Sequence, residues 1–588
     1  MDVGYRPVGD FECAGNVGGT PSYATTRPTI SPPNAPVHRP LTFAIRTTVA
    51  ALLALTSAHL LGIHHPWWAA MTVWLVAQPT RGLLIERSLA RLTGTICGAV
   101  AGALILISWA HDLPIALTVL AFWLALCAGL GTIFRHFRNY GFVLAGYTAG
   151  IVVLFGLSDG HADAVLAQDR VLCTLIGIAC STLLSFRALP LKHTNAGTHA
   201  RSLLDRVLRL VESEPAEQRL NTDPTLVAEI GAFDRAIDDY AAGSLRRRFD
   251  ALRLRHISGV LLELVALARS GQGGVTAADE KQDDPLQRVR SLAGNAVLGD
   301  RPALANALGD LVQALEPDRQ TAWSHFRFDF NPVEAVRAAG RPVLALALAA
   351  IIWLASGWQA GAMMAMTAVL FTSLFSSHDH GNHMVIQVMI GTLAGAAAGL
   401  LTRLFLLPQA DGLLLPMLVC ITPFLLVSAW LMRQSATGKM AIDMAMTFLL
   451  TAQPGSAPVT AEIALPEAVA IVSGVFIAVT MFWLVLPSTP AVRCGLMARR
   501  IVHLTALIAR SPDRASSRSR HEALRSTFVR LLDAAAPDGP LFTAAQACLA
   551  SAADARSLNS HSARVAALEA SVALDALITS NTRRKCNA

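Results

Sequence analysis

The amino-acid sequence predicts an all-α membrane protein, with about twelve transmembrane helices as a 6+6 repeat and a cytoplasmic helical domain after each half. The composition supports this prediction, because 53% of the 588 residues are hydrophobic and only 15% are charged. Soluble domains carry about a quarter charged residues. The apolar residues also gather in two zones, which we place at 39–190 and 337–487 as the two membrane blocks.

A glycine motif is repeated in the two blocks. The pattern G-T-x-x-G-x-x-x-G occurs once in each, inside a long apolar run. Glycines at this spacing form a flat stripe of small residues on one helix face, which lets membrane helices pack closely. The helix-packing glycines predicted in this way are Gly94, Gly98, Gly102, Gly391, Gly395 and Gly399. Matching copies in two blocks predict a duplicated bundle, a plan common among secondary transporters.

Each block contains six apolar runs of a length that suits a membrane span. The runs of the first block lie at about 41–62, 66–80, 92–110, 113–130, 140–157 and 170–187. The runs of the second block lie at about 342–356, 358–376, 385–407, 412–432, 439–453 and 466–486.

Lysine and arginine residues are distributed unequally between the connections of these spans. If the N-terminus is cytoplasmic, the outer connections of the first block carry none, apart from the borderline Arg170. The second block repeats this pattern, with Arg403 as its exception. The inner connections of the first block contain Arg81, Arg87, Arg91, Arg135, Arg138, Arg187 and Lys192. The positive-inside rule therefore predicts a multi-pass protein with cytoplasmic N- and C-termini and two parallel repeats.

The segments outside the blocks have a different character. Residues 1–38 are rich in Gly, Pro and Thr without an apolar core, which predicts a disordered leader and not a signal peptide. Residues 191–336 and 488–588 place apolar and charged side chains at helical spacing, which predicts two cytoplasmic helical domains. The net charge of +7 fits topology-setting residues better than a nucleic-acid site, so we expect no nucleic-acid partner.

Several classes of site are not indicated. The nine cysteines form no C-x-x-C pair, so neither a disulfide framework nor a zinc site is expected. The sequence has no phosphate-binding loop, kinase pattern or Rossmann fingerprint, which argues against an enzyme, a cofactor or ATP hydrolysis on this chain. His378, His380 and His383 lie near Asp379, but a short loop does not readily converge them on a metal, and none is predicted.

The segment 66–82 is the most informative local stretch. Between its prolines it rises only about 18 Å as a helix, short of the roughly 30 Å hydrocarbon core. The sequence predicts a broken or half-inserted helix whose free backbone groups face a cavity. Gln78 and Arg81 could then hold a carboxylate, because guanidinium binds it with a bidentate fork. Alternatively, Trp67 and Trp68 are interfacial anchors and Arg81 is a topology charge.

Three motifs carry a resemblance to a known family. They are W-A-x-x-T-V-x-x-V-x-Q-P-T-R-G from Trp68, R-x-x-G-T-x-x-G from Arg91, and the run from Arg138 through Tyr140 to Tyr147. This pattern resembles the fusaric acid resistance family, which includes bacterial aromatic acid exporters, and the layout agrees over nearly the whole chain beyond residue 38. The resemblance implies a proton-driven inner-membrane exporter that works with a periplasmic adaptor (membrane fusion) protein and an outer-membrane channel.

The candidate substrate-binding residues come from this first block. They are Trp68, Thr72, Gln78, Arg81, Thr95, Tyr140 and Tyr147. The two tyrosines are two helical turns apart and share a face, so they could stack on an aromatic substrate. The alternative is that they belong to the packed core.

Two carboxylates are candidates for proton coupling. Asp443 lies inside the eleventh span, where an ionisable group suggests function. Lys439 lies four residues earlier, however, and a local ion pair would explain Asp443 without function. Asp379 follows the eighth span, where the resemblance implies an acidic residue.

The sequence thus predicts efflux of small organic acids, chiefly aromatic carboxylates, across the bacterial inner membrane, driven by the proton motive force. One alternative is a passive organic-anion channel, since plant malate channels resemble this layout. Another is a membrane scaffold or sensor that transports nothing. The expected partners are the lipid bilayer, the acid, the adaptor and the outer-membrane channel, and a homo-oligomer is left open.

Overall fold

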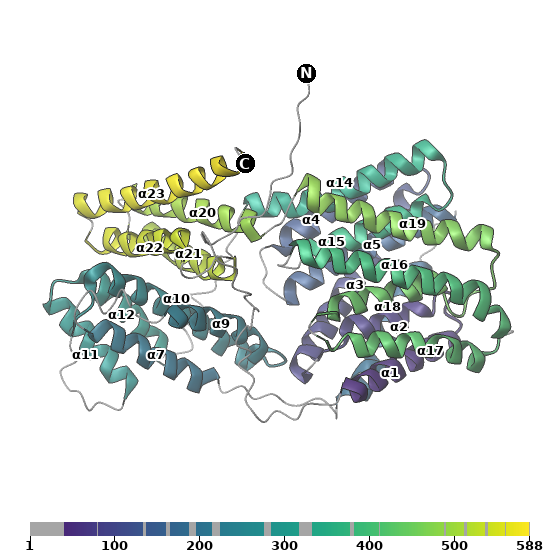
Figure 1. Ribbon diagram of the computed structural model, residues 1–588, viewed down its shortest axis with the longest axis horizontal. Helices are drawn as coiled ribbons and strands as arrows, with labels where there is room; N and C mark the ends of the chain where they lie inside the picture. Colours follow the sequence, from purple (N-terminus) through teal and green to yellow (C-terminus); the bar gives the residue numbers. More distant parts are fainter. Residues whose placement is uncertain are drawn as a thin grey trace, which may run out of the picture. The chain divides into compact units, whose positions relative to one another are not determined.

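The computed structural model describes residues 40–586, with gaps. The gaps are 79, 133–136, 160–164, 187–195, 214–223, 276–283, 317–331, 377–380, 411, 435, 487–489, 511–513, 535–538 and 559. Within these limits all regular secondary structure is helical, without strands (Figure 1). The helices form two compact units. We call the one that contains 20–191 and 330–488 the membrane unit, and the one that contains 192–329 and 489–588 the amphipathic unit.

The membrane unit contains the helices of the two apolar blocks. In the first block these are α1 (Pro40–Leu60), α2 (Trp67–Val76), α3 (Arg81–Trp109), α4 (Leu113–Gly131), α5 (Phe137–Asp159) and α6 (Val165–Ser185). In the second they are α14 (Pro332–Ser356), α15 (Gly361–Ser376), α16 (Gly381–Leu401), α17 (Leu414–Leu431), α18 (Gly438–Ala452) and α19 (Ala461–Thr480). Short π-helical turns, Thr402–Leu406 and Met481–Val485, extend α16 and α19.

The lengths and compositions of these helices suit a membrane. Among the described residues, nine helices are long and apolar enough to cross one, and Trp67–Val76 and Gly361–Leu374 are shorter apolar helices. The prediction of an all-helical fold with apolar helices long enough to cross a membrane is therefore confirmed for the described residues, and the 6+6 repeat stays a prediction. The number of about twelve spans stays a prediction.

Helix α2 is short because the chain leaves the helix after Val76. The Ala77 backbone has φ −53° and ψ 121°, which is not helical. The chain becomes helical again at α3, where the Thr80 hydroxyl caps the Leu83 N–H at 3.5 Å. With 10 residues, α2 is about 15 Å long. The break that the sequence predicts in the segment 66–82 is thus present.

Glycines of the repeated motif lie at close helix contacts in both blocks. Helix α3 packs on α5, and α16 packs on α18. A Cβ atom on Gly98 would lie 2.5 Å from the Ala145 carbonyl oxygen, and one on Gly399 would lie 2.8 Å from that of Phe448. Gly94 and Gly102 contact α5 in the same way, and Gly391 and Gly395 contact α18. Both helix pairs therefore depend on the absence of a side chain at these positions.

The two blocks also pack on each other reciprocally. The first helix of each block packs on the fourth helix of the other, in the pairs α1 with α17 and α14 with α4. The second helix of each packs on the fifth helix of the other, in the pairs α2 with α18 and α15 with α5. The blocks thus use the same elements toward each other in both directions.

The amphipathic unit is built from two parts of the sequence. The earlier part contains α7 (Ala196–Glu212), α9 (Pro224–Ala241), α10 (Leu245–Leu267), a π-helical turn (Ala268–Gln272), α11 (Pro285–Leu298) and α12 (Pro302–Leu315). The later part contains α20 (Pro490–Arg510), α21 (Arg514–Ala534), α22 (Pro540–Leu558) and α23 (His561–Cys586). The sequence pattern predicts two separate helical domains from these parts. In the structure their buried side chains form one hydrophobic core. For example, α10 packs on both α21 and α22.

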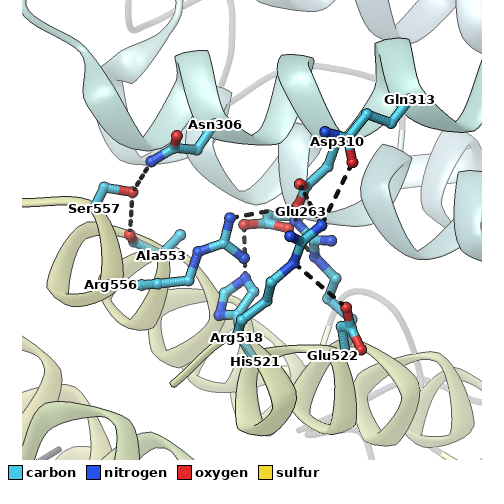
Figure 2. Close-up of polar contacts among 11 residues, drawn as sticks. Glu263, Asn306, Asp310, Gln313, Arg518, His521, Glu522, Ala553, Arg556 and Ser557 are labelled. Carbon is cyan, nitrogen blue, oxygen red and sulfur yellow. Dashed lines mark hydrogen bonds and ion pairs between the residues drawn. The ribbon is translucent and has the colours of Figure 1, made fainter. Parts of the chain in front are cut away.

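A buried ionic cluster joins the two parts of this core (Figure 2). His521 Nε2 on α21 donates to Glu263 Oε1 on α10 at 2.8 Å, and Arg525 pairs with the same carboxylate. Arg525 Nη2 also donates to Asp310 on α12 at 2.9 Å, and Arg556 on α22 approaches that oxygen at 3.4 Å. Burial alone would raise the pKa of Glu263, but Arg525 and His521 hold it well below its usual range. The carboxylates thus neutralise the buried guanidinium groups within the cluster.

Candidate functional site

The candidate site surrounds helix α2, whose residues are all buried. This helix packs against α1, α3, α6 and α18. Its sequence, WWAAMTVWLV, is apolar apart from one threonine, so it can be enclosed on every side. Polar groups that reach α2 from its neighbours are therefore shielded from water.

Arg91 on α3 is one of these groups, and its side chain is fully buried. Its Nη1 donates to the Tyr140 hydroxyl at 3.0 Å and to the Tyr147 hydroxyl at 3.3 Å, and its Nη2 donates to Thr72 Oγ1 at 3.3 Å. No carboxylate among the described residues pairs with it. Arg87, one turn earlier, lies over the Tyr140 ring at 4.9 Å. A buried cation that is surrounded by neutral hydroxyls is costly, which makes it a candidate for function.

Arg170 on α6 is the second buried cation near α2, with 3% of its surface exposed. Its guanidinium carbon lies 4.9 Å from the centre of the Trp68 ring. Its Nε and Nη1 atoms are buried without a hydrogen-bond partner among the described residues. Trp68 also stacks on His65 at 4.5 Å and meets the edge of Phe155 at 5.9 Å. Arg170 thus lies at an aromatic cluster with part of its donor capacity unused.

The carboxylate next to Arg170 in the chain has another partner. Asp169 Oδ2 accepts from the His64 backbone N–H at 3.3 Å and lies 3.1 Å from His64 Nδ1. Successive residues of a helix point about 100° apart, so Asp169 and Arg170 face different neighbours. Asp169 therefore fastens the loop before α2 and does not neutralise Arg170.

A small recess lies beside the other end of α2. It is shallow: the space between its side chains, about 220 Å³, includes open solvent and encloses no room for a water molecule. Its polar lining residues are Arg46, Thr47, Gln78, Ser181 and Ser185. The guanidinium of Arg46 lies 5.5 Å from the Phe43 ring, and that of Arg433 lies at the same distance from it. The recess is thus a polar hollow with positive charge at its edge.

The predicted substrate-binding residues fall into separate groups. Four of them, Trp68, Thr72, Tyr140 and Tyr147, come together around the two buried arginines. Gln78 lines the recess. Thr95 is buried on α3, one turn beyond Arg91. Arg81 is not part of the cluster, because it begins α3 and its guanidinium lies over the Phe186 ring at 5.0 Å.

Of the two predicted proton-coupling residues, Asp443 lies in the part of the chain that the structure describes. Asp443 is 6% exposed on α18, where Lys439 is the charge that acts on it. Asp379 and its loop at 377–380 lie outside the described residues.

The structure places Arg91 inside a helix and not in a connection between helices, while the side of the membrane on which it lies stays a prediction. Arg91 lies three turns inside α3 and is fully buried, because Tyr140, Tyr147 and Thr72 accept its hydrogen bonds. In the sequence, Arg170 stands out only as a borderline exception to the positive-inside rule. In both cases the signal in the sequence is an arginine within an apolar run.

The second block contains a buried arginine in a different setting. Arg403, in the turn that extends α16, donates from Nη1 to Glu467 Oε2 at 2.6 Å and from Nη2 to Gln453 Oε1 at 3.0 Å. Gln453 Nε2 also donates to the Glu467 carboxylate at 3.1 Å. This cation is therefore neutralised by its own block.

Comparison with known proteins gives a family match for the chain. The model of the fusaric acid resistance protein family matches residues 40–325 and 276–556. The p-hydroxybenzoic acid efflux pump subunit AaeB of Escherichia coli O9:H4 (strain HS) is 22% identical over 429 residues, 65% of each chain. The AaeB of Yersinia pestis (strain Pestoides F) is 22% identical over 441 residues, 65% of this chain and 66% of the relative.

A shorter match has higher identity. The uncharacterized transporter YdhK of Escherichia coli (strain K12) is 33% identical over 144 residues, 24% of this chain. The chain thus spans about a fifth of the length of YdhK, 22%, and less than two thirds of AaeB, 65% in the first case. These names are those of transporters and efflux pumps. No solved structure matches the chain.

Proposed function

Because this chain belongs to the fusaric acid resistance protein family, we propose that it exports small organic acids, chiefly aromatic carboxylates, across the bacterial inner membrane. The printed name of the AaeB relatives, p-hydroxybenzoic acid efflux pump subunit, supports both the direction and the class of substrate. The apolar helices of the membrane unit support a multi-pass membrane protein.

The observation that carries the proposal is the fully buried Arg91 among neutral partners. Charge-assisted hydrogen bonds are roughly twice as strong as neutral ones, so a carboxylate is a better partner for this guanidinium than a hydroxyl. A hydroxyl can accept and donate at once. Tyr140 and Tyr147, which accept from Arg91, therefore each carry a proton that a bound carboxylate could accept.

The shape of the surroundings favours an aromatic acid. Trp68, His65 and Phe155 form a ring cluster one turn of α2 away from Thr72. Aromatic rings attract each other in stacked and edge-to-face arrangements, by about 0.5–1.5 kcal/mol beyond burial. An aromatic carboxylate would offer its charge to Arg91 and its ring to this cluster.

The energy source and the carrier of the proton are further parts of the proposal. We place proton coupling on Asp443, which is buried on α18, a helix that packs on α2. Asp379 stays the second candidate. Protonation of a carboxylate next to the path would be coupled to release of the anion.

The arrangement in the membrane is proposed as a 6+6 parallel repeat with cytoplasmic termini. The reciprocal packing of the two blocks and their matching glycine contacts support this arrangement. The word subunit in the name of the AaeB relatives supports an assembly with a periplasmic adaptor and an outer-membrane channel.

The test is loss of radiolabelled 4-hydroxybenzoate from preloaded cells that express the chain with its adaptor, with and without a protonophore. We expect faster loss that the protonophore abolishes. Fast loss that survives the protonophore would favour an anion channel. No acceleration for any of a panel of acids would contradict transport and favour a scaffold.

Variants then locate the site. Arg91→Gln should abolish the accelerated loss while Arg341→Gln, a change of another buried arginine, should preserve it. Arg341 is a suitable control because its Nε is already bonded to the Leu486 carbonyl at 3.0 Å. Efflux that is undiminished in the Asp379→Asn, Asp443→Asn double variant would exclude both as proton carriers.

A further inference from the structure

We propose that Arg170 and Trp68 form a second binding step for the aromatic carboxylate, one helical turn along α2 from Arg91. The anion would pass between two guanidinium groups that reach α2 from different helices. This inference rests on the proposed function, because it names a later position of the same substrate.

The two arginines approach α2 at neighbouring turns. Arg91 bonds Thr72, and Arg170 lies over Trp68, four residues earlier. Four residues of helix rise about 6 Å. The turns are joined directly, since the Thr72 hydroxyl donates to the Trp68 carbonyl at 3.0 Å. Tyr147, whose hydroxyl accepts from Arg91 Nη1 at 3.3 Å, also interacts electrostatically with Arg170.

Arg170 has unused binding capacity. A guanidinium carries five N–H donors. The Trp68 ring attracts its charge but accepts none of its donors in the way an oxygen does. The buried Nε and Nη1 atoms are without a hydrogen-bond partner among the described residues. Burying such donors unpaired is unfavourable, so their retention suggests an acceptor that comes and goes.

The acceptor has to come from outside the described residues of this cluster. The nearest carboxylate in sequence, Asp169, is held by His64 through two contacts. An incoming carboxylate can accept a charge-assisted hydrogen bond from either of these unpaired donors, Nε–H or Nη1–H. Its ring would then lie in the cluster of Trp68, His65 and Phe155, which explains why an aromatic acid suits this step.

The experiment measures the rate at which two radiolabelled acids, 4-hydroxybenzoate and hexanoate, are taken up into inside-out vesicles, the direction that corresponds to efflux from the cell. The variants are Arg170→Gln, Arg170→Lys and Trp68→Leu, each in the full chain at matched membrane abundance. Arg341→Gln is the matched control: Arg341 is also buried and also lies on an aromatic ring, Phe482, at 4.7 Å, but its Nε is bonded.

We expect Arg170→Gln to lower kcat/KM for 4-hydroxybenzoate by roughly tenfold or more, the scale of one charge-assisted pair. Arg170→Lys keeps the charge but loses the unpaired Nε and Nη1 donors of the guanidinium, so it should recover part of that loss. Trp68→Leu should raise KM for 4-hydroxybenzoate several-fold more than for hexanoate, a ratio that a purely structural role would not change.

Three outcomes decide the inference. Arg170 variants with wild-type kinetics beside an inactive Arg91→Gln would overturn the second step and leave the proposed function standing. Equal KM changes for both acids in Trp68→Leu would remove the aromatic part. If Arg170→Gln is not inserted, Arg170→Lys decides, and unchanged kinetics there would reject the step. Wild-type vesicles that transport neither acid would count against the proposed function itself.

Discussion

The two blocks of the membrane unit share their packing but differ in how they treat a buried arginine. In the first block, Arg91 and Arg170 have hydroxyl and aromatic neighbours and no described carboxylate. In the second, Arg403 is bonded to Glu467 and Gln453. Arg91 and Arg170 therefore keep positive charge available to an anion, whereas the charge of Arg403 is cancelled within its own block.

The glycine contacts show which positions correspond. Gly98 meets Thr148 as Gly395 meets Thr447. The residues just before these threonines are Tyr147 in the first block and Met446 in the second. By the same reasoning, Arg91, three residues before Gly94, corresponds to Val388, three before Gly391. Arg91 and Tyr147 thus have apolar counterparts, whereas by the same offset Tyr140 corresponds to Lys439.

A second set of contacts identifies the counterpart of Arg170 in the second block. Gly177 packs on Thr72, and Gly474 packs on Thr367. Seven residues before these glycines, and so on the same helix face, lie Arg170 and Glu467. A cation in one block stands where the other has an anion. The comparison teaches that the two blocks share these small-residue contacts but differ in the charges at corresponding positions.

The largest effect on stability is expected from Glu467→Gln. Removing this carboxylate leaves the Arg403 guanidinium buried without its charge partner, at a cost of about 3 kcal/mol. Thermal unfolding of the purified protein would measure the loss. Glu462→Gln, an exposed change on the same helix, is the control. Equal stability of the two variants would show that the second block tolerates an uncancelled arginine as the first does.

The next effect distinguishes Arg91, which we propose binds substrate, from Arg403, which we expect to contribute to stability. Arg91→Gln should lower kcat/KM for 4-hydroxybenzoate on the order of a hundredfold, since it removes a charged partner worth about 1.5–3 kcal/mol. Arg403→Gln should change stability and leave KM unaltered. The measurement is initial efflux rate against substrate concentration in vesicles. A KM increase in Arg403→Gln would mean that both blocks bind substrate.

A third effect tests the shared packing. Gly98→Ala and Gly395→Ala should each destabilise the protein by about 2 kcal/mol, because the new methyl group meets a backbone carbonyl of the partner helix. Gly129→Ala is the control, since its Cβ would lie 3.9 Å from the nearest atom, the Ala335 carbonyl oxygen. If only one of the two glycine variants lowers the unfolding midpoint, the two helix pairs are not equivalent.

The smallest expected effect is a pH dependence of stability in the amphipathic unit, where the buried Arg525 is paired with Glu263 and Asp310. Burial, opposed by Glu263, lowers the pKa of His521 from 6.5, so this side chain is neutral when folded and takes up a proton on unfolding. Its contribution is complete above about pH 6.5 and is lost as pH falls. The depressed pKa of Glu263 acts in the same direction below about pH 4.5.

Hydrogen exchange of α10 and α21 in the full chain would measure this dependence. Protection should fall between pH 7.5 and 5.5 by more than that of α18, at rates corrected for intrinsic exchange. His521→Gln should flatten the difference. Protection that is independent of pH in the wild type would contradict the assignment of His521.

Much of the fold could be predicted from the sequence because its signals are local. Apolar runs and glycine spacing predict membrane helices and their close contacts from a few consecutive residues. Thr72, Tyr140 and Tyr147 could be chosen because they lie in motifs of a known family. Arg81 lies in such a motif too, yet the structure places it away from the cluster.

What the sequence determined by itself is the helical membrane architecture, the repeated glycine motif and the family. What only the tertiary structure decided is which charges are buried and what neutralises them. Arg91 meets Thr72 and Tyr147 across 19 and 56 positions, and Glu263 meets His521 across 258. A charge acts through its neighbours in space, and pattern along the chain does not specify them.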